Sequence, residues 1–342
     1  MPQFRVVRLA HMKTALRTSI ATRSPEQNRP AWGVAQRPAA QGFRLQLAEV
    51  ATSTMATVAV FYLLLRGRWV PGFATCVAVF SIIAIAPPLL RWLAQAFPGS
   101  KALDIAASFW LIPAAAFGHM HFGPLSDAVH PRLMDQYLAL ADLHLFGGHP
   151  SIFLSRFATP WVVELLMICY FSYFVLHLVL GVSLYWQGRR RAFDEFVLAL
   201  ALFYCVIYAL YLAVPAIGPR FFLANEFKEP LNGVFLTPYL DALMRTTPFN
   251  RDCFPSGHTG AALIVLTYAF RFDRRVFWAL LPLGTGLIAA TVIGRYHYGI
   301  DLICAVPIAL VVMGLASALA RARPHGLQIP RSTWITQEPA RI

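Results

Sequence analysis

The chain has 342 residues, of which 58% are hydrophobic and 13% are charged, and its mean hydropathy is +0.57. Soluble domains carry about 25% charged residues, so this composition excludes an ordinary soluble protein and indicates an integral membrane protein. The net charge is +13, but the basic residues gather at the termini and in short loops. This distribution is typical of segments that face anionic lipid, and we expect the membrane, not nucleic acid, as partner.

The chain begins with a polar and basic segment, residues 1–45, in which eight Lys or Arg residues stand against the single acid Glu26. We predict that this segment is a mobile tail on the cytoplasmic side. The predicted order after it is N-terminal transmembrane helices and an outer loop over 46–134, a catalytic membrane domain over 135–320, and a C-terminal tail over 321–342.

Apolar runs follow the tail. They cover 46–65, 73–97, 103–118, 161–186, 193–214, 258–270, 276–294 and 300–320. A bilayer needs about 20 apolar residues per helix, and the run at 258–270 reaches this only when extended and tilted. The run at 103–118 contains Pro113, and a span and a re-entrant segment stay open for it. We therefore expect an all-α integral membrane protein with about eight transmembrane helices.

Short basic connections predict the orientation of these helices. "WQGRRRAFDE" (186–195) and "RFDRR" (271–275) fall on the same side as both termini when there are eight spans. Basic short loops stay cytoplasmic, which places the loops at 119–160, 215–257 and 295–299 outside. We expect a multi-pass protein of the bacterial inner membrane with its polar loops on the extracytoplasmic face.

The long segment at 119–160 contains "ADLHLFGGHP" (141–150), which predicts an interfacial amphipathic helix followed by a turn at Gly147–Pro150. Five histidines lie in this segment: His119, His121, His130, His144 and His149. They lack the i, i+4 spacing with carboxylates that a zinc-binding helix shows. The five cysteines lack CxxC spacing. We interpret the histidines as solvated or interfacial and expect neither a metal nor a cofactor.

Two polar stretches, "NRDCFPSGHTGAA" (250–262) and "GRYHYGID" (294–301), lie at the edges of apolar runs. In the second, His297 and Asp301 are four residues apart, which places them on one face of a helix. A carboxylate that holds one imidazole nitrogen fixes the tautomer and leaves the other nitrogen able to attack. The spacing is common, and taken alone it favours an interfacial histidine near a helix start with an acid in its first turn.

In the first stretch, Pro255 ends the incoming chain and Ser256 is a good N-cap for the following helix. Gly257 leaves room for ligand oxygens beside the backbone, where free N–H groups at a helix start bind anions. His258 then lies beside that anion site, where it can protonate a leaving oxygen. A plain capped helix start is the alternative.

Three arginines accompany these stretches: Arg220 after "VPAIGP", Arg251 before "PSGH", and Arg295 two residues before His297. A guanidinium grips phosphate oxygens in a bidentate manner, although each arginine can also snorkel to lipid headgroups.

"PSGH" followed by "RYHYGID", with "GPR" upstream, resembles the type 2 phosphatidic acid phosphatase superfamily. Within it, "ADLHLFGGHP", "VPAIGPR", "DCFPSGHTG" and "RYHYGIDL" are most similar to the inositol-phosphorylceramide-synthase-like (inositolphosphotransferase) branch. The resemblance covers about residues 135–315. It implies a six-helix catalytic bundle and a phosphoenzyme mechanism that needs no metal.

The resemblance also implies roles for the residues. His297 would attack phosphorus, Asp301 would hold it and His258 would protonate the departing oxygen. The phosphate oxygens would contact Ser256, the Gly257 N–H, Arg220 and Arg295, with Arg251 as a further candidate. The chain departs from the family pattern in two places: the usual lysine seven residues before Arg-Pro is missing, and Thr291 stands where an arginine is usual. Both departures favour the inositolphosphotransferase-like branch.

The same residues serve transfer to an alcohol or lipid acceptor and hydrolysis of a lipid phosphate or polyprenyl diphosphate, so both reactions stay open. A headgroup-binding lipid transporter or scramblase is the alternative from another class. Transporters keep ionisable residues at the membrane midplane. Here Glu49, Arg91 and Glu164 lie near the ends of their runs, and only His177 lies in the middle of one, where we interpret it as a satisfied buried histidine.

Overall fold

The computed structural model describes residues 44–67, 69, 71–228, 230–245, 251–322 and 327–328. Within these ranges the regular secondary structure is helical apart from two short strands, β1 (Arg44–Leu45) and β2 (Leu327–Gln328), which pair antiparallel. Most of the predicted tail at 1–45 and most of the predicted tail at 321–342 lie outside the described residues. The all-α class expected from the apolar runs is confirmed.

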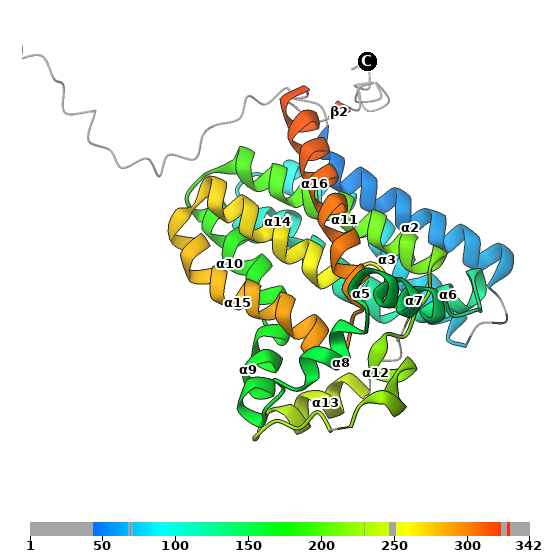
Figure 1. Ribbon diagram of the computed structural model, residues 1–342. Coiled ribbons are helices and arrows are strands. Elements are labelled where there is room, and N and C mark those ends of the chain that lie inside the picture. The colour runs from blue at the N-terminus through cyan, green and yellow to red at the C-terminus, as the bar shows by residue number, and fades with distance from the viewer. Residues whose placement is uncertain are drawn as a thin grey trace, which may run out of the picture. The chain divides into compact units, whose positions relative to one another are not determined.

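The helices follow the apolar runs. The first group is α2 (Leu47–Arg66), α3 (Phe73–Ala96), α4 (Lys101–Phe109), α5 (Leu111–Met120) and α6 (Phe122–Val129). The middle group is α7 (Asp135–Phe146), α8 (Pro150–Ser155), α9 (Pro160–Phe171), α10 (Tyr173–Trp186) and α11 (Arg190–Ala213). The last group is α12 (Pro219–Phe222), the 3₁₀ helix η2 (Ala224–Glu226), α13 (Thr237–Arg245), α14 (Gly257–Phe272), α15 (Arg274–Ile293) and α16 (Gly299–Ala322) (Figure 1).

Among the described residues, five helices are long and apolar enough to cross a membrane, namely α2, α3, α11, α15 and α16. Two bent pairs raise the number to seven if each pair is one span: α4 with α5, bent by 46°, and α9 with α10, bent by 47°. Helix α14 has 16 residues, fewer than the roughly 20 that a straight span needs. The protein is therefore a multi-pass integral membrane protein with five to seven candidate spans in its described part.

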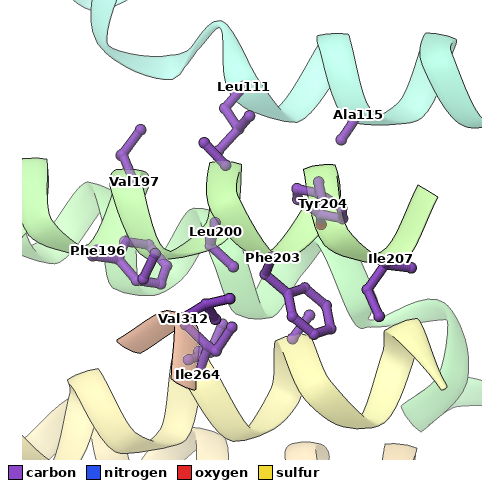
Figure 2. Close-up of a cluster of buried hydrophobic side chains, with 14 of the residues drawn as sticks. Leu111, Ala115, Phe196, Val197, Leu200, Phe203, Tyr204, Ile207, Ile264 and Val312 are labelled. Atoms are coloured by element: carbon purple, nitrogen blue, oxygen red, sulfur yellow. The ribbon is translucent and has the colours of Figure 1, made fainter. Parts of the chain in front are cut away.

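Helix α11 forms the centre of the helix packing and is buried along most of its length. Figure 2 shows its side chains between α5 and α14, with Leu111 and Ala115 on one side and Ile264 on the other. Ala199 and Ala201 are fully buried, and small residues of this kind let neighbouring helix backbones approach closely. Large rings such as Phe203 are also fully buried there, so the core is a packed aromatic and aliphatic layer.

The basic turns lie at one end of the helices. The α10–α11 turn with Arg189–Arg191 and the α14–α15 turn with Arg271–Arg275 are at the end far from α12 and α13 (Figure 1). At the basic end, Arg190 Nη2 lies 2.8 Å from Asp104 Oδ2, which ties α11 to α4. The connections that carry the "PSGH" and "GRYHYGID" stretches leave their helices at the opposite end.

The helix and turn expected at 141–150 are present as the end of α7, a turn at Gly147 with φ of +70°, and the start of α8. Helix α7, however, has its polar and apolar faces the opposite way round from an ordinary surface helix. Leu140 and Leu143 are about half exposed, whereas Asp135 and Asp142 are fully buried. An apolar outer face suits lipid, and the inward carboxylates find backbone N–H groups to accept from.

Candidate active site

A cavity of about 480 Å³ lies among α5, the α9–α10 pair, α11, α12 and the starts of α14 and α16. Four of the predicted site residues line it: His258, His297, Arg220 and Gly257. The ring centroids of His258 and His297 are 6.1 Å apart. The two polar stretches therefore meet across one cavity, as expected from the prediction that both lie on one side of the membrane.

His297 is held in one orientation by two acceptors. Its Nδ1 lies 2.7 Å from the carbonyl oxygen of Cys253 and 3.2 Å from Asp301 Oδ2. A carbonyl oxygen only accepts, so the hydrogen-bond network assigns the proton to Nδ1. The lone pair of the neutral ring is then on Nε2, the nitrogen that a nucleophile uses. The predicted His297–Asp301 contact is confirmed, and both side chains are buried.

The Asp301 carboxylate has further donors. Its Oδ2 accepts from the Tyr298 N–H at 2.8 Å and from the Cys253 thiol at 3.0 Å. Burial, and then the neighbouring Asp301, raise the pKa of the Cys253 thiol well above its usual value, so the thiol stays protonated and donates. Together these donors fix the carboxylate beside Nδ1 of His297.

Two buried carboxylates from α7 hold the loop that carries His297. Asp142 accepts from the N–H groups of Gly299 and Ile300, each at 2.8 Å. It thereby caps α16 from another helix and satisfies N–H groups that a helix start leaves unpaired. Asp135 accepts from the Tyr298 hydroxyl at 2.9 Å. Neither carboxylate was predicted as part of the site.

Asp135 also holds the turn of the "GPR" stretch. It accepts from the N–H groups of Ile217 and Gly218 at 3.0 and 2.9 Å. Gly218 has φ of +84°, and a Cβ there would lie 2.5 Å from the Tyr296 carbonyl oxygen, so only glycine fits. The Arg220 N–H then donates to the Arg295 carbonyl at 2.8 Å, which docks the two arginine-bearing segments on each other.

His258 lies against two tyrosine rings. Tyr170 stacks on it at 4.5 Å and Tyr173 lies at 4.6 Å, between ring centroids. Behind them, the Tyr204 hydroxyl is 2.9 Å from that of Tyr173 and 3.3 Å from His177 Nε2. His177 Nδ1 lies 2.7 Å from the Tyr173 carbonyl, so both of its ring nitrogens have partners. The interpretation of His177 as a satisfied buried histidine is confirmed.

The predicted cap of α14 is confirmed. The Ser256 Oγ accepts from the Thr259 N–H at 3.2 Å and donates to Thr259 Oγ1 at 3.0 Å. Ser256 is fully buried and is not on the cavity wall, so its hydroxyl faces the first turn of its own helix. Gly257 does face the cavity, and a Cβ there would collide with the Tyr211 hydroxyl.

Two of the three predicted arginines lie together. Arg220 lines the cavity, and its Nη1 donates to the Tyr296 hydroxyl at 3.2 Å. Arg295 is buried beside it, with its guanidinium 4.1 Å from the Phe227 ring centroid. Burial, and then the positive charge of Arg220, lower the pKa of Arg295. Its φ of +65° is in the left-handed region, a strain of about 1–3 kcal/mol.

Arg251 lies elsewhere. Its Nη2 pairs with Asp127 Oδ1 at 2.9 Å and its Nη1 donates to the Pro131 carbonyl at 3.1 Å. It does not line the cavity. The structure therefore separates Arg251 from the other predicted phosphate contacts, because the end of α6 offers it a carboxylate.

The cavity wall contains residues that sequence reasoning missed. Six of them are tyrosines, namely Tyr170, Tyr173, Tyr204, Tyr208, Tyr211 and Tyr296. The spacing of Tyr204, Tyr208 and Tyr211 places them on one face of α11, and this pattern was readable. His119 and Asp252 also line the cavity, with His119 Nε2 3.4 Å from Asp252 Oδ2. Asp252 directly precedes the stretch "CFPSGH", but it was not predicted as a site residue.

Cys253, His297 and Asp301 bring a thiol, an imidazole and a carboxylate within 4.8 Å of one another, a grouping that can hold a metal ion. In this structure the same side chains already form hydrogen bonds with one another. Nδ1 of His297 faces a carbonyl and a carboxylate, and the protonated thiol donates to Asp301. A zinc site needs a thiolate and a bare imidazole nitrogen, so the grouping fits a hydrogen-bond relay better than a metal centre.

Comparison with known proteins agrees with this geometry. The family model described as PAP2 superfamily matches residues 136–315, a little over half of the chain. The match includes both histidines, Asp301, Arg220 and the buried carboxylate Asp142. No curated protein and no solved structure matches the chain. The chain belongs to the PAP2 superfamily, and this membership supports an enzyme of the lipid phosphatase or phosphotransferase type.

Proposed function

We propose that this membrane enzyme transfers a phosphorus-bearing headgroup, of the inositol-phosphate kind, from one lipid to a hydroxyl of an acceptor. The group is carried between them on His297. The observation that carries the proposal is the pair of histidines on one cavity, 6.1 Å apart between ring centroids. One of them has its tautomer set by Cys253 and Asp301, and the other lies in an aromatic slot.

The reaction has two steps. In the first, His297 Nε2 forms a bond to phosphorus, the bond from phosphorus to the lipid oxygen breaks, and His258 gives its proton to that oxygen. Asp301 stabilises the positive charge that His297 gains. In the second, the acceptor oxygen bonds to phosphorus, the N–P bond breaks, and His258 takes the acceptor proton back.

The phosphate oxygens are assigned to the Arg220 guanidinium and to the Gly257 N–H at the start of α14. A helix start of this kind favours anions. Arg295 adds positive charge from behind Arg220. Ser256 serves the site by capping α14, and Arg251 by anchoring its loop to Asp127.

The size and lining of the cavity favour transfer over hydrolysis. Its volume of about 480 Å³ is within the range of about 300–1,000 Å³ for small-molecule pockets and exceeds what a phosphate alone needs. Tyrosine rings can stack on a cyclic headgroup while their hydroxyls bond to it. Water is the alternative acceptor: it would release free phosphate from a simple lipid phosphate, and the phosphate ester of the headgroup from a lipid that carries one. The partial exposure of His119 and Asp252 favours this alternative, since solvent reaches them.

We further propose that α14 is a tilted eighth span and that the cavity faces the extracytoplasmic side of a bacterial inner membrane. The basic turns at Arg189–Arg191 and Arg271–Arg275 lie at the end of the helices far from α12 and α13 (Figure 1). Short basic loops stay cytoplasmic. The donor headgroup is then taken from the outer leaflet.

The function is tested with purified protein in detergent and ³²P-labelled phosphatidic acid, phosphatidylinositol and a polyprenyl diphosphate. Each is incubated with and without ceramide or diacylglycerol, in buffer and in EDTA. We expect a new labelled phospholipid when an acceptor lipid is present, with unchanged rate in EDTA. A water-soluble labelled phosphate, free or as inositol phosphate, without any new phospholipid would establish hydrolysis instead. Turnover of none of the three contradicts the proposal, and a rate lost in EDTA and restored by a divalent ion contradicts its independence of metals.

The side of the membrane is tested by single cysteines in a background whose native cysteines are replaced. Lys228→Cys lies in the exposed stretch before α13, and Arg189→Cys in the α10–α11 turn. Arg189 is preferred to its neighbour Gly188, whose φ of +70° disfavours a side chain. A membrane-impermeant maleimide should label Lys228→Cys in intact cells and Arg189→Cys only after lysis. The opposite pattern overturns the orientation.

A further inference from the structure

We propose that His119 and Asp252 form a binding site for headgroup hydroxyls, so that the cavity selects lipids whose phosphate carries a neutral polyol. This inference rests on the proposed function and adds the residues that recognise the part of the headgroup beyond phosphorus.

His119 and Asp252 both lie on the wall of the cavity. His119 is near the end of α5 and Asp252 is in the loop before α14, and both line the cavity that His258 and His297 share. His119 Nε2 and Asp252 Oδ2 are 3.4 Å apart, with about a third of each side chain exposed. By contrast, the His297 and Asp301 side chains are 5% and 0% exposed. The first pair is thus open to a ligand, whereas in the second pair His297 lines the cavity and Asp301 is fully buried behind it.

The backbone on both sides of the pair is fixed. Asp252 pairs with Ala216 in an isolated parallel bridge, and the Cys253 N–H donates to the Ala216 carbonyl at 3.2 Å. On α5, the Ala115 carbonyl accepts from the Tyr208 hydroxyl at 2.9 Å. Because the carbonyl of Cys253 also holds His297, the pair has a set distance from the atom that attacks phosphorus.

The chemistry of the pair suits hydroxyls better than phosphate or ammonium groups. A second phosphate beside Asp252 would meet a negative carboxylate, which disfavours diphosphates. A quaternary ammonium would find aromatic rings and a carboxylate, but His119 lies beside that carboxylate and competes for it. A carboxylate and an imidazole can accept from and donate to neighbouring hydroxyls on one ring, and the tyrosines of the wall provide a flat apolar face for that ring.

The test compares three ³²P-labelled lipids in the same micelles: phosphatidylinositol, phosphatidic acid and phosphatidylcholine. In Asp252→Ala and His119→Ala, KM for phosphatidylinositol should rise at least about tenfold, since hydrogen bonds to a charged group are lost. KM and kcat for phosphatidic acid should stay within about twofold, which also shows that the variants are folded. His121→Ala is the matched control: it is two residues away, bonds to the Phe117 carbonyl and is not on the cavity wall.

Equal losses for phosphatidylinositol and phosphatidic acid would mean that the pair only ties α5 to the loop, and would overturn the inference. Equal or better use of phosphatidylcholine by the wild-type protein would also overturn it. If the wild-type protein hydrolyses phosphatidic acid and ignores phosphatidylinositol, this inference fails while a phosphatase activity remains. If it uses none of the three lipids, the proposed function fails as well.

Discussion

The two histidines of the cavity are held by different kinds of contact. Directional hydrogen bonds fix His297. The Thr291 carbonyl accepts from the backbone N–H groups of Tyr296 and His297, each at 2.9 Å. The Cys253 carbonyl and the Asp301 carboxylate accept from the His297 ring. The start of α14 instead presents His258 to the flat faces of Tyr170 and Tyr173. Hydrogen bonds fix a direction and a tautomer, whereas stacking fixes mainly a plane.

This difference matches the two proposed roles. A nucleophile must meet phosphorus along one line, so a small rotation of its ring is costly. A proton donor needs to reach an oxygen whose position varies with the lipid, and a ring that can turn in its slot serves that purpose. Substitutions around His297 should therefore cost far more than matched substitutions around His258.

The largest effect of the variants compared here is expected for Asp301→Asn. The amide offers an N–H toward Nδ1 and favours the wrong tautomer, so kcat should fall by about 10⁴-fold, as when the orienting acid of a catalytic triad is replaced. The measurement is kcat with phosphatidic acid, with circular dichroism to check that the helices persist. A loss below about tenfold in a folded variant would show that Asp301 does not orient His297.

His258→Gln should lower kcat by about 10³-fold for an alkyl phosphate ester, since the departing alkoxide loses its proton donor. The p-nitrophenolate of p-nitrophenyl phosphate departs without a proton, so its release in the first step should be slowed much less, even though the second step still needs His258 as a base. The check is the rate of the first step, measured by rapid mixing as the burst of each alcohol product. Equal losses in that step with both esters would assign His258 a role other than protonation of the leaving oxygen.

Two substitutions at Tyr170 test whether stacking holds His258 in place. The Tyr170 ring stacks on both His258 and Tyr296. Tyr170→Phe keeps the ring and should stay within about twofold of wild type in kcat. Tyr170→Ala removes the stacking, worth about 0.5–1.5 kcal/mol, and should lower kcat by about three- to tenfold. If Tyr170→Phe is as slow as Tyr170→Ala, the hydroxyl matters and the ring contact does not.

Asp142→Asn tests the support of the His297 loop with the smallest expected effect on chemistry. In the wild type, the Gly299 and Ile300 N–H groups each donate to a different carboxylate oxygen of Asp142. The amide of the variant has only one acceptor oxygen for these two N–H groups. Loss of a bond to a charged group costs about 1.5–3 kcal/mol, so the melting temperature in detergent should fall by a few degrees. An unchanged melting temperature would mean that α16 does not need this cap.

Local patterns predicted much of this arrangement. Seven of the eight apolar runs coincide with a long helix or with a bent pair, and the run at 258–270 coincides with the shorter α14, because apolar length is set by the bilayer. The His297–Asp301 contact follows from helical spacing, and the Ser256 cap from its place before α14. In each case the partners are within four residues, so the chain itself brings them together.

Contacts between distant segments were not readable. Asp142 and Asp135 reach partners 157 and 163 residues away, and nothing near them in the sequence marks α7 as carrying its carboxylates inward. Arg251 fits a phosphate contact by its place beside "PSGH", yet a carboxylate on α6 takes it. Such choices depend on which groups tertiary packing brings together.

The central claim is that phosphorus is bound covalently to His297 during turnover. Protein mixed with ³²P-labelled phosphatidic acid is quenched in alkali, in which phosphohistidine survives, and the labelled peptide is sequenced. The account predicts label at His297 in wild type and in the control His121→Ala, and its loss in His297→Ala. Label at His258 or Cys253, or label that persists in His297→Ala, would contradict it.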